Sequence, residues 1–597
     1  MSAFAGIVNL SGAPVDRALL HSMTDSLAPR GPDGRGVWHF EGAALAHVLL
    51  RTTDEAALES QPFSFDGSAW IVADARVDAR AQLVADLKAA GRKASVTRPD
   101  VELILHAWHA WGEECAERLL GDFAFAIWDS GRRRLHCARD HFGVKPFFHA
   151  HKGDTVVFAS SLAAIRLHPA VSSALDDLAV ADFLIFGHPQ QRDASAFADI
   201  RRLPPAHRAT WSQSGVRYNR YWSLPVDAPL YLRRREDYPA RLEELLREAV
   251  RDRTRTDRIG IMMSGGLDST LLASFAKDIL DERGKGELKA YTSLVGPNDE
   301  ERGYAEDVAG ALGIPVHYFD SNETARAMSG SRFALTDEPS DDPAGIAIAR
   351  VEYATMAAHS RVHFFGEGPD NALVYEWKRY VAWLWSHRDL PRFVRDAAAS
   401  AIAHPRIPLI GTLNGKRNRR PGHENPFPPW LDPGLAARLK LRERWEECMR
   451  MPVSPHPVRP AGHGSFGLSL WQEIFRGFDF DYTGAAIEVR HPYLDLRVLR
   501  FLLQVPVLPW CREKYLMRQV GRGRLPESVR RRPKKTIAGD PFRFPGLPVT
   551  GLPDPAREVL SSYVAILGDE STARESSRSY WVDIRPDALA AWLRHSV

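Results

Sequence analysis

The sequence predicts an α+β domain with an antiparallel sheet, followed by an α/β domain with a parallel sheet. Short apolar or alternating segments fill the first third of the 597-residue chain. From about residue 237 onward, apolar strand-like segments alternate with helix-like ones. The first pattern is typical of antiparallel sheets and the second of parallel ones. The length also exceeds what one domain usually contains.

The first domain is expected over residues 1–222. AFAGIVNL, AWIVADARV and FAFAIWD have the composition of strands, and VELILHAWHAWGEECAERLL lies among them as a helix. The strand-like segment HRATWSQSGVRYNRYW ends the domain at Trp222. Residues 223–236 contain two prolines and a run of arginines, which predicts a linker.

The second domain is expected over residues 237–597. PARLEELLREAVRDR predicts an amphipathic helix, and RIGIMM, KAYTSLV, PVHYF and RVHFF predict strands separated by helices. Such alternation favours a parallel sheet covered by helices. A tryptophan-rich, helical insert is predicted at about 371–472.

Composition excludes several classes of protein. The formal net charge is only +3, which gives no electrostatic reason to expect nucleic acid or membrane as a partner. The four cysteines form no CxxC pair, and no apolar run reaches the roughly 20 residues of a membrane span. No signal peptide is recognised at the start. We therefore expect a cytoplasmic protein.

The strongest chemical signal is the segment SGGLDST, which directly follows the strand RIGIMM. Its glycines allow the backbone to approach a phosphate chain, and the next helix begins with free N–H groups. The candidate phosphate-binding residues are Ser264, Gly265, Gly266, Asp268, Ser269 and Thr270. A carboxylate beside phosphate implies a bridging cation such as Mg²⁺. The chain has no GxxxxGK[ST] loop, so we expect this loop to hold leaving pyrophosphate.

A second acidic turn, GEGPD, follows the strand RVHFF. Parallel strands bring their carboxyl ends to one edge, so this turn is expected to face the first loop. Asp268 and Asp370 would then share Mg²⁺, and Glu367 would move a proton. Further along lies the basic run RRRPKK, in which one lysine could neutralise an acyl-phosphate intermediate. Spacing alone leaves Lys534 and Lys535 both open.

With these motifs in place, the chain resembles the asparagine-synthetase superfamily over nearly its whole length. RGPD, FAFAIWDSGRRRLHCARDHFGVKPFF and FASS resemble its N-terminal-nucleophile-like glutaminase-type domain. Four later segments resemble its pyrophosphate-loop synthetase domain: SGGLDST, GEGPD, IEVRHPYLDLR and RRRPKKT. The resemblance implies that the loop binds ATP, that Asp268 and Asp370 hold Mg²⁺, and that Glu367 and Lys534 act on an acyl-adenylate. An amine then attacks, which makes the chain an AMP-forming carbon–nitrogen ligase.

Departures from the family motif concern the first domain. Glutamine-dependent members begin Met-Cys-Gly, whereas this chain has Ser2 at the nucleophile position, and a hydroxyl is a weaker nucleophile than a thiol. The glutamine-holding Asn-Gly-Glu is replaced by Asp74-Ala75-Arg76. Arg51 and Asp100 still match the glutamine site. We expect the first domain to be an inactive structural partner.

Four segments are most similar to the lasso-peptide cyclase branch: the replacement at 74–76, HPYLDLR, the segment with Pro509, Trp510 and Lys514, and RPKKTIAGDP. That branch closes a macrolactam between the N-terminal amine of a precursor peptide and an Asp or Glu side chain. Its expected partners are the precursor, a leader peptidase and a leader-binding protein. The alternatives are an asparagine-synthetase-like or β-lactam-synthetase-like enzyme using ammonia or a small amine, and an inactive binding scaffold. β-Lactam formers typically carry tyrosine where this chain has Glu367.

The tryptophans of the insert suggest a further hypothesis. Most of them are expected to pack between helices, but part of the insert could wall a peptide-sized cleft, because aromatic and arginine side chains suit peptide anchoring. Trp383 and Trp385 are the candidates.

Overall fold

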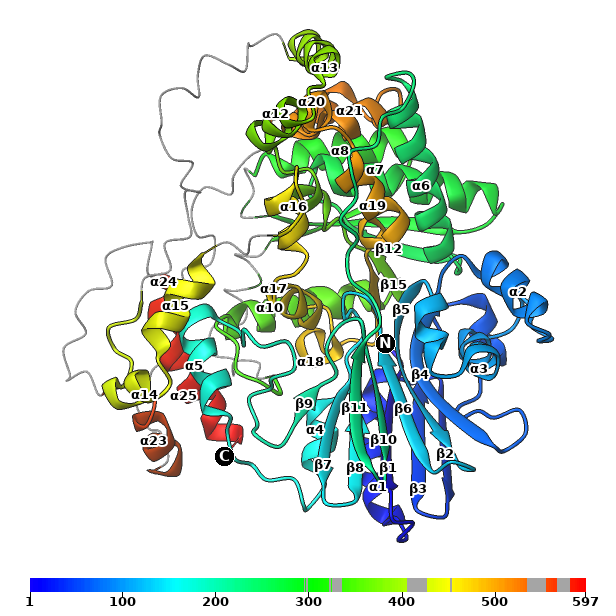
Figure 1. The fold of residues 1–597 in the computed structure, drawn as a ribbon, viewed down its shortest axis with the longest axis vertical. Coiled ribbons are helices and arrows are strands. Elements are labelled where there is room, and N and C mark those ends of the chain that lie inside the picture. Colours follow the sequence, from blue (N-terminus) through cyan, green and yellow to red (C-terminus); the bar gives the residue numbers. More distant parts are fainter. Residues whose placement is uncertain are drawn as a thin grey trace.

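The computed structural model describes residues 1–294, 296, 299–320, 324, 336–404, 427–450, 454–533, 554–565 and 580–596. The strands of the first domain lie side by side in the lower part of Figure 1, and the helices of the second domain lie above them. Both predicted sheet types are present, antiparallel in the first domain and parallel in the second.

Two antiparallel sheets form the first domain. One has the order β2 (Gly34–Phe40), β3 (Ala43–Leu49), β1 (Ala3–Asn9), β8 (Thr155–Ala159), β7 (Phe148–Lys152) and β9 (Arg201–Arg202). The other has the order β11 (Gly215–Arg220), β10 (His207–Ser212), β6 (Arg134–Arg139), β5 (Gly121–Asp129) and β4 (Ala69–Val77). The predicted last strand is a hairpin instead, because Gly215 has a positive φ of 114° and allows a turn between β10 and β11.

The two sheets face each other across a shared apolar core. Phe4, Phe158 and Val72 are among its fully buried members and come from both sheets. Helices α1 (Arg17–Leu27), α4 (Leu162–Arg166) and α5 (Asp177–Phe186) share a core with the first sheet. Helices α2 (Arg80–Ala89) and α3 (Asp100–Trp111) share one with the second. The result is a four-layer sandwich with a helical layer outside each sheet.

The second domain is built on a five-stranded parallel sheet. Its order is β14 (Val316–Asp320), β13 (Glu287–Leu294), β12 (Arg258–Met262), β15 (Val362–Phe364) and β16 (Glu488–Arg490). The chain moves from β12 outward to β13 and β14, and then returns to the opposite side of β12 with β15. The strand order therefore reverses between β12 and β15, and ligands of open α/β sheets bind at such a switch point.

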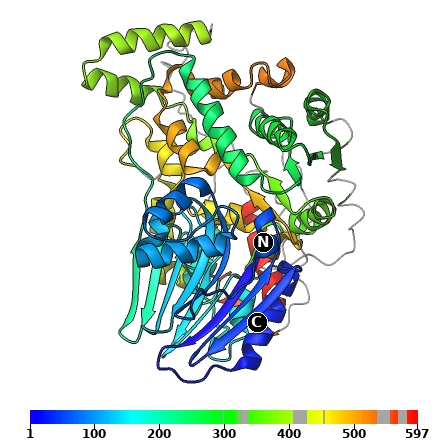
Figure 2. The same ribbon diagram turned by 90° about the vertical axis from the view of Figure 1, so that its right-hand side faces the viewer.

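The rest of the described part of this domain is mainly helical, and helices fill the upper half of Figure 2. They are α6 (Asp237–Arg253), α7 (Leu267–Glu282), α8 (Glu301–Leu312), α10 (Pro343–Ala357), α11 (Pro369–Ala372), α12 (Trp377–Ser386), α13 (Leu390–Ala403), α16 (Pro460–Ser465), α17 (Leu470–Arg476), α18 (Phe480–Thr483), α19 (Leu496–Gln504), α20 (Val507–Trp510), α21 (Tyr515–Val520) and α22 (Glu527–Arg530). Among the described residues, none of the helices has the length and apolar character to cross a membrane.

Late segments of the chain return to the first domain. Helices α14 (Pro433–Arg438), α15 (Leu441–Met449), α23 (Asp554–Ser561), α24 (Tyr580–Asp583) and α25 (Arg585–Ser596) gather beside α5 at the lower left of Figure 1. Trp430 and Trp592 are buried in the core that also contains Leu184 of α5. The part of the insert from Trp430 to Leu441 therefore shares a core with the first domain, whereas Phe466 and Trp471 pack in the core of the second.

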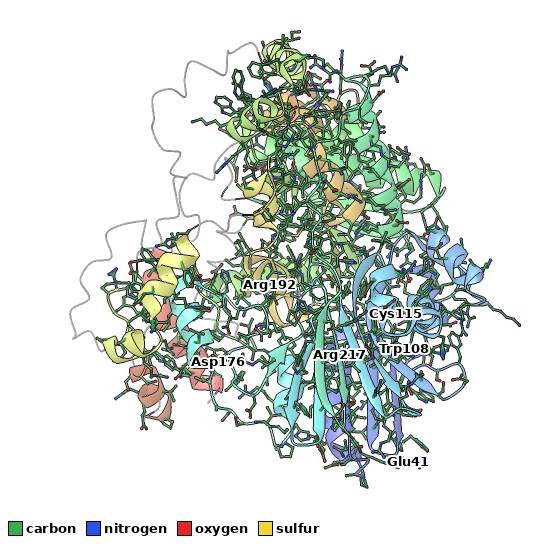
Figure 3. All side chains as sticks on the ribbon, viewed as in Figure 1. Glu41, Trp108, Cys115, Asp176, Arg192 and Arg217 are labelled. Carbon is green, nitrogen blue, oxygen red and sulfur yellow. The ribbon has the colours of Figure 1, made fainter. Side chains whose placement is uncertain are left out.

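The two domains also touch through side-chain contacts at their junction. Arg192, labelled in Figure 3, donates a hydrogen bond to the carbonyl of Gly467, and Gln472 Nε2 donates to the carbonyl of Arg192 over 2.9 Å. Arg30 makes a two-pronged ion pair with Asp479, with N–O distances of 2.7 and 2.6 Å. These contacts fix the first domain against α16–α18 of the second.

Candidate functional site

The SGGLDST segment forms the turn from β12 into α7. Gly265 has a positive φ of 46°, and a Cβ there would lie 2.6 Å from Cβ of Tyr304. A residue with a side chain would therefore be strained and would clash. Helix α7 begins after Gly266 without a side-chain cap, so the first N–H groups of the helix face the loop. Such a start suits an anion.

Hydroxyl groups stabilise this turn from within. Ser269 Oγ accepts a hydrogen bond from the N–H of Ser264 over 3.3 Å, and Thr270 Oγ1 donates to the carbonyl of Gly266 over 2.8 Å. Ser269 and Thr270 are buried, whereas Ser264 is exposed. Four of the six predicted loop residues, Ser264, Gly266, Ser269 and Thr270, thus take part in hydrogen bonds within the loop.

The GEGPD turn follows β15 and packs against the first loop. A Cβ at Gly366 would lie 3.1 Å from the backbone nitrogen of Ser269, so the two turns pack closely and a side chain there would crowd the first loop. Glu367 is half-buried and Asp370 is exposed in this turn. The two turns therefore lie against each other at the carboxyl edge of the sheet, as the sequence predicts.

The carboxylates of Asp268 and Asp370 converge on a single cation. The ammonium group of Lys514 is ion-paired with Asp268 and lies 2.7 Å from Asp370 Oδ1. Burial lowers the pKa of Lys514, but the two carboxylates outweigh it and raise that pKa above its usual value. A position that both acids share with one cation is what a divalent metal ion requires. The Lys514 ammonium marks a position that carboxylate oxygens of both acids reach, and carboxylate oxygens are ligands that Mg²⁺ accepts.

The segment after β16 supports the loop from the other side. The hydroxyl of Tyr493 donates a hydrogen bond to the main-chain carbonyl of Asp268 over 3.0 Å. Asp495 caps α19 and accepts a hydrogen bond from Arg253 over 2.8 Å. Two nearby guanidinium groups overcome the effect of burial and lower the pKa of Asp495. These contacts give Asp495 a structural role beside the loop.

The third arginine of the basic run RRRPKK, Arg532, contacts the SGGLDST loop. Arg532 donates to the carbonyl of Gly265 over 3.2 Å and forms an ion pair with Glu301 at 2.6 Å. Its guanidinium lies over the ring of Tyr304, 4.0 Å from the centroid. Arg518 in turn donates to the carbonyl of Arg532 over 2.8 Å. Lys534 and Lys535 lie outside the described residues, but the chain that leads to them is fixed beside the loop.

In the first domain, the glutamine-site positions are engaged in other contacts. The hydroxyl of Ser2 accepts a hydrogen bond from the N–H of Leu50 over 3.0 Å. Arg76 is fully buried and pairs with Asp78 and, at 2.5 Å, with Asp122.

Asp100 and Asp74 are also bound by cations. The Asp100 carboxylate is paired with Arg80 and, at 2.5 Å, with Arg255 of the second domain. The Asp74 carboxylate pairs with Lys145 at 2.9 Å.

Lys145 connects the two domains. Its ammonium group lies 2.9 Å from Asp74 and 2.9 Å from Glu488 of β16, and its side chain is only 1% exposed. Glu488 also accepts a hydrogen bond from Arg490 Nε over 2.6 Å. Burial raises the pKa of Asp74, whereas the cations around Glu488 overcome burial and lower its pKa. This chain of buried charges reaches from β4 to the strand that carries the Tyr493 loop.

Two contributors to the site were not assigned by sequence reasoning. In the sequence, Lys514 stands out only as part of the segment with Pro509 and Trp510, and Tyr493 only as part of HPYLDLR. Neither has a local signal, because each acts on residues more than 100 positions away, as the 246-residue separation of Lys514 from Asp268 shows. Only an alignment with related chains could have identified Lys514 and Tyr493, through a constant sequence spacing from neighbouring motif residues.

Comparison with known families divides the chain into two parts. Residues 1–222 match the glutamine amidotransferase domain family, and residues 241–583 match the asparagine synthase family. The second match covers more than half of the chain, and it contains both loops, Lys514 and Tyr493.

Individual relatives agree with these matches. The chain is 30% identical over 288 residues to asparagine synthetase [glutamine-hydrolyzing] 3 of Bacillus subtilis, an alignment that covers 48% of this chain and 46% of that protein. It is 28% identical to asparagine synthetase [glutamine-hydrolyzing] 1 of the same organism, over 62% of this chain and 58% of the relative. Amidase chry2 of Gibberella zeae is 24% identical over 89% of this chain and 86% of its own length. The chain thus spans about half the length of the first two relatives.

Proposed function

Since this chain belongs to the asparagine synthase family, we propose that it is an ATP-dependent, AMP-forming carbon–nitrogen ligase. The observation that carries this proposal is the convergence of Asp268 and Asp370 on one cation position beside the phosphate loop. A carboxylate of the substrate attacks the α-phosphorus of ATP, which forms an acyl-adenylate and releases pyrophosphate. An amine then attacks the acyl carbon, AMP leaves and the amine loses a proton.

The phosphate loop holds the leaving pyrophosphate in this proposal. The N–H groups at the start of α7 face the loop, and Gly265 allows the backbone to make this turn against Tyr304, where a side chain would clash. Arg532, which is bound to the carbonyl of Gly265, adds positive charge at the rim. The helix N–H groups and Arg532 would stabilise the transition state most strongly, because negative charge then builds up on the leaving pyrophosphate.

Asp268 and Asp370 would hold Mg²⁺, which supplies charge neutralisation to the phosphates when bound. Glu367 follows Gly366, the glycine that lies against Ser269 of the first loop, and it would accept the proton of the attacking amine. Lys534 would stabilise charge on the acyl-adenylate. Arg532, two residues earlier, is bound beside the loop, which supports this assignment.

We further propose that the first domain does not hydrolyse glutamine. Arg76 and Asp74, which replace residues of the glutamine site, are both committed to buried ion pairs. Asp100 is bound by two arginines. A substrate would have to displace these partners and leave buried charges unpaired, which is costly. The attacking amine therefore comes from outside this domain.

The proposed reaction is macrolactam closure of a precursor peptide, as in the lasso-peptide cyclase branch. An amine on the same molecule as the activated Asp or Glu carboxylate has a high effective concentration, so no separate ammonia source is needed. The precursor and, in the same pathway, a leader peptidase and a leader-binding protein are the proposed partners. Asparagine synthesis is the second candidate, because the relatives from Bacillus subtilis are named asparagine synthetases. Their names specify glutamine hydrolysis, whereas the proposed loss of glutaminase activity would leave free ammonia as the amine in this chain.

Mass spectrometry tests these readings against each other. Candidate precursor peptides, incubated with the protein, Mg²⁺ and ATP, should lose one water while AMP and pyrophosphate appear. Aspartate with ammonia should give no asparagine. The reverse result would replace macrolactam closure by asparagine synthesis. Absence of pyrophosphate release with every substrate, in a protein shown to bind ATP, would remove the ligase proposal itself.

A further inference from the structure

The ammonium group of Lys514 contacts both acids of the site. Its ammonium group pairs with Asp268 and lies 2.7 Å from Asp370. Its side chain is 16% exposed, so water screens these pairs only partly. Two carboxylates at one site repel each other, and a cation between them relieves the repulsion.

The backbone around Lys514 is arranged for this placement. Glu513 and Lys514 have positive φ angles of 50° and 55°, which L-residues with side chains rarely adopt in succession. Arg518 Nε donates a hydrogen bond to the carbonyl of Glu513 over 2.7 Å and fixes this conformation. Unfavourable backbone geometry persists where surrounding contacts impose it, and it often marks functional positions. Here it directs Lys514 from the start of α21 toward α7 and α11.

We propose that Lys514 is an internal substitute for the metal ion, which keeps the two acids together in the metal-free protein and must leave before Mg²⁺ binds. The inference rests on the proposed function, because it assumes that Asp268 and Asp370 are the metal ligands. Its consequence is that Lys514 competes with the metal ion. Free Mg²⁺ then binds weakly, and the site fills mainly when nucleotide brings the metal with it.

Metal binding without nucleotide tests this competition. Mn²⁺ is used as the probe, and the free ion is counted by electron paramagnetic resonance in titrations of the full-length protein. Lys514→Met should bind Mn²⁺ at least about tenfold more tightly than the wild type, because a competing charge has been removed from the site. Lys514→Arg keeps the charge and should stay within about threefold of the wild type.

Lys277→Met is the matched control. Lys277 is on the same helix as Asp268 and pairs with Asp281 at the surface, so its removal changes the net charge equally but leaves the site intact. Its Mn²⁺ affinity should equal that of the wild type. An equal gain in both methionine variants would reduce the effect to overall charge and overturn the inference.

A second readout uses the unaltered protein. Amine-reactive labelling followed by peptide mass spectrometry should show Lys514 protected without metal and labelled several times faster with Mn²⁺ present. Constant labelling would overturn the inference even if Lys514→Met folded poorly. Equal and measurable Mn²⁺ affinity in wild type and Lys514→Met would overturn it too, but would leave the ligase proposal standing. No Mn²⁺ binding in any variant, with or without ATP, would remove the metal site and both proposals.

Discussion

The hydroxyl of Tyr493 donates a hydrogen bond to the main-chain carbonyl of Asp268, with an oxygen–oxygen distance of 3.0 Å. Tyr493 is fully buried, and it follows β16, which contacts the first domain through Glu488. The bond therefore links the position of a proposed metal ligand to a strand at the domain interface.

Removal of this hydroxyl should slow the reaction without unfolding the protein. Tyr493→Phe deletes one hydrogen bond, worth about 1 kcal/mol, and frees the turn that carries Asp268. We expect pyrophosphate release to fall about fivefold or more, with the unfolding midpoint nearly unchanged. Tyr482→Phe, on the neighbouring helix α18, is the comparison and should keep wild-type activity. Equal rates for all three proteins would show that the bond has no part in positioning Asp268.

The Lys145 ammonium should be important for stability. Lys145→Met leaves Asp74 and Glu488 buried with less compensation, and we expect a loss of about 3–5 kcal/mol in the free energy of unfolding. Lys152→Met breaks a pair with Asp199 in which the lysine is 37% exposed, and should cost less than about 1 kcal/mol. Denaturant titrations of both variants provide the measurement. Similar small losses in the two would mean that the domain junction does not depend on Lys145.

Acidification should destabilise the first domain through its buried histidines. Burial lowers the pKa of His136 to about 3 and that of His141 to about 4. An unfolded histidine takes up a proton near pH 6.5, so between pH 6.5 and about 3 the unfolded state binds more protons. Stability is thus complete above pH 6.5 and falls as the pH drops, by up to about 1.4 kcal/mol per pH unit for each such histidine.

His136→Phe should reduce this pH dependence. Urea midpoints of variant and wild type should converge as the pH is lowered from 7 to 5, because the variant has one fewer proton to gain on unfolding. Between pH 7 and 8 their difference should stay constant. Parallel curves from pH 8 to 5 would contradict the assignment of the acid sensitivity to His136.

Of the two candidate tryptophans of the insert, Trp385 is the one that is free to contact a peptide through most of its surface. Trp385 is 73% exposed, whereas Trp383 stacks on His387 with ring centroids 4.2 Å apart. We expect Trp385→Ala to weaken precursor binding about tenfold, as for an aromatic anchor, and to leave ATP binding intact. Phe40→Ala, at a 54%-exposed position of the first domain, is the control. Unchanged precursor affinity in Trp385→Ala would remove the cleft hypothesis for this surface.

Lys534 and Lys535 can be separated by mutation. Lys534→Ala should bind ATP but lose turnover by about 100-fold or more, as expected for a group that stabilises transition-state charge. Lys535→Ala should retain most of its activity. Inactivity of Lys535→Ala instead would shift the motif by one residue.

Much of the site could be predicted because its parts are local. Ser264–Thr270 and Gly366–Asp370 each lie directly after a strand, and the strand–turn–helix pattern already implies the edge at which they meet. The late helices that share a core with α5 could not be predicted in this way. Trp430 and Trp592 have the same apolar character whichever domain buries them.

The sequence by itself determined the two sheet types, the order of the motifs and the meeting of the two acidic turns, because these depend on hydrophobic periodicity and on residues adjacent along the chain. Only the tertiary structure decided which cation lies between Asp268 and Asp370, and which partners bind Asp74, Arg76 and Asp100. Those pairings join residues that are distant in sequence. Their energies depend on burial and distance, which exist only once the chain has folded.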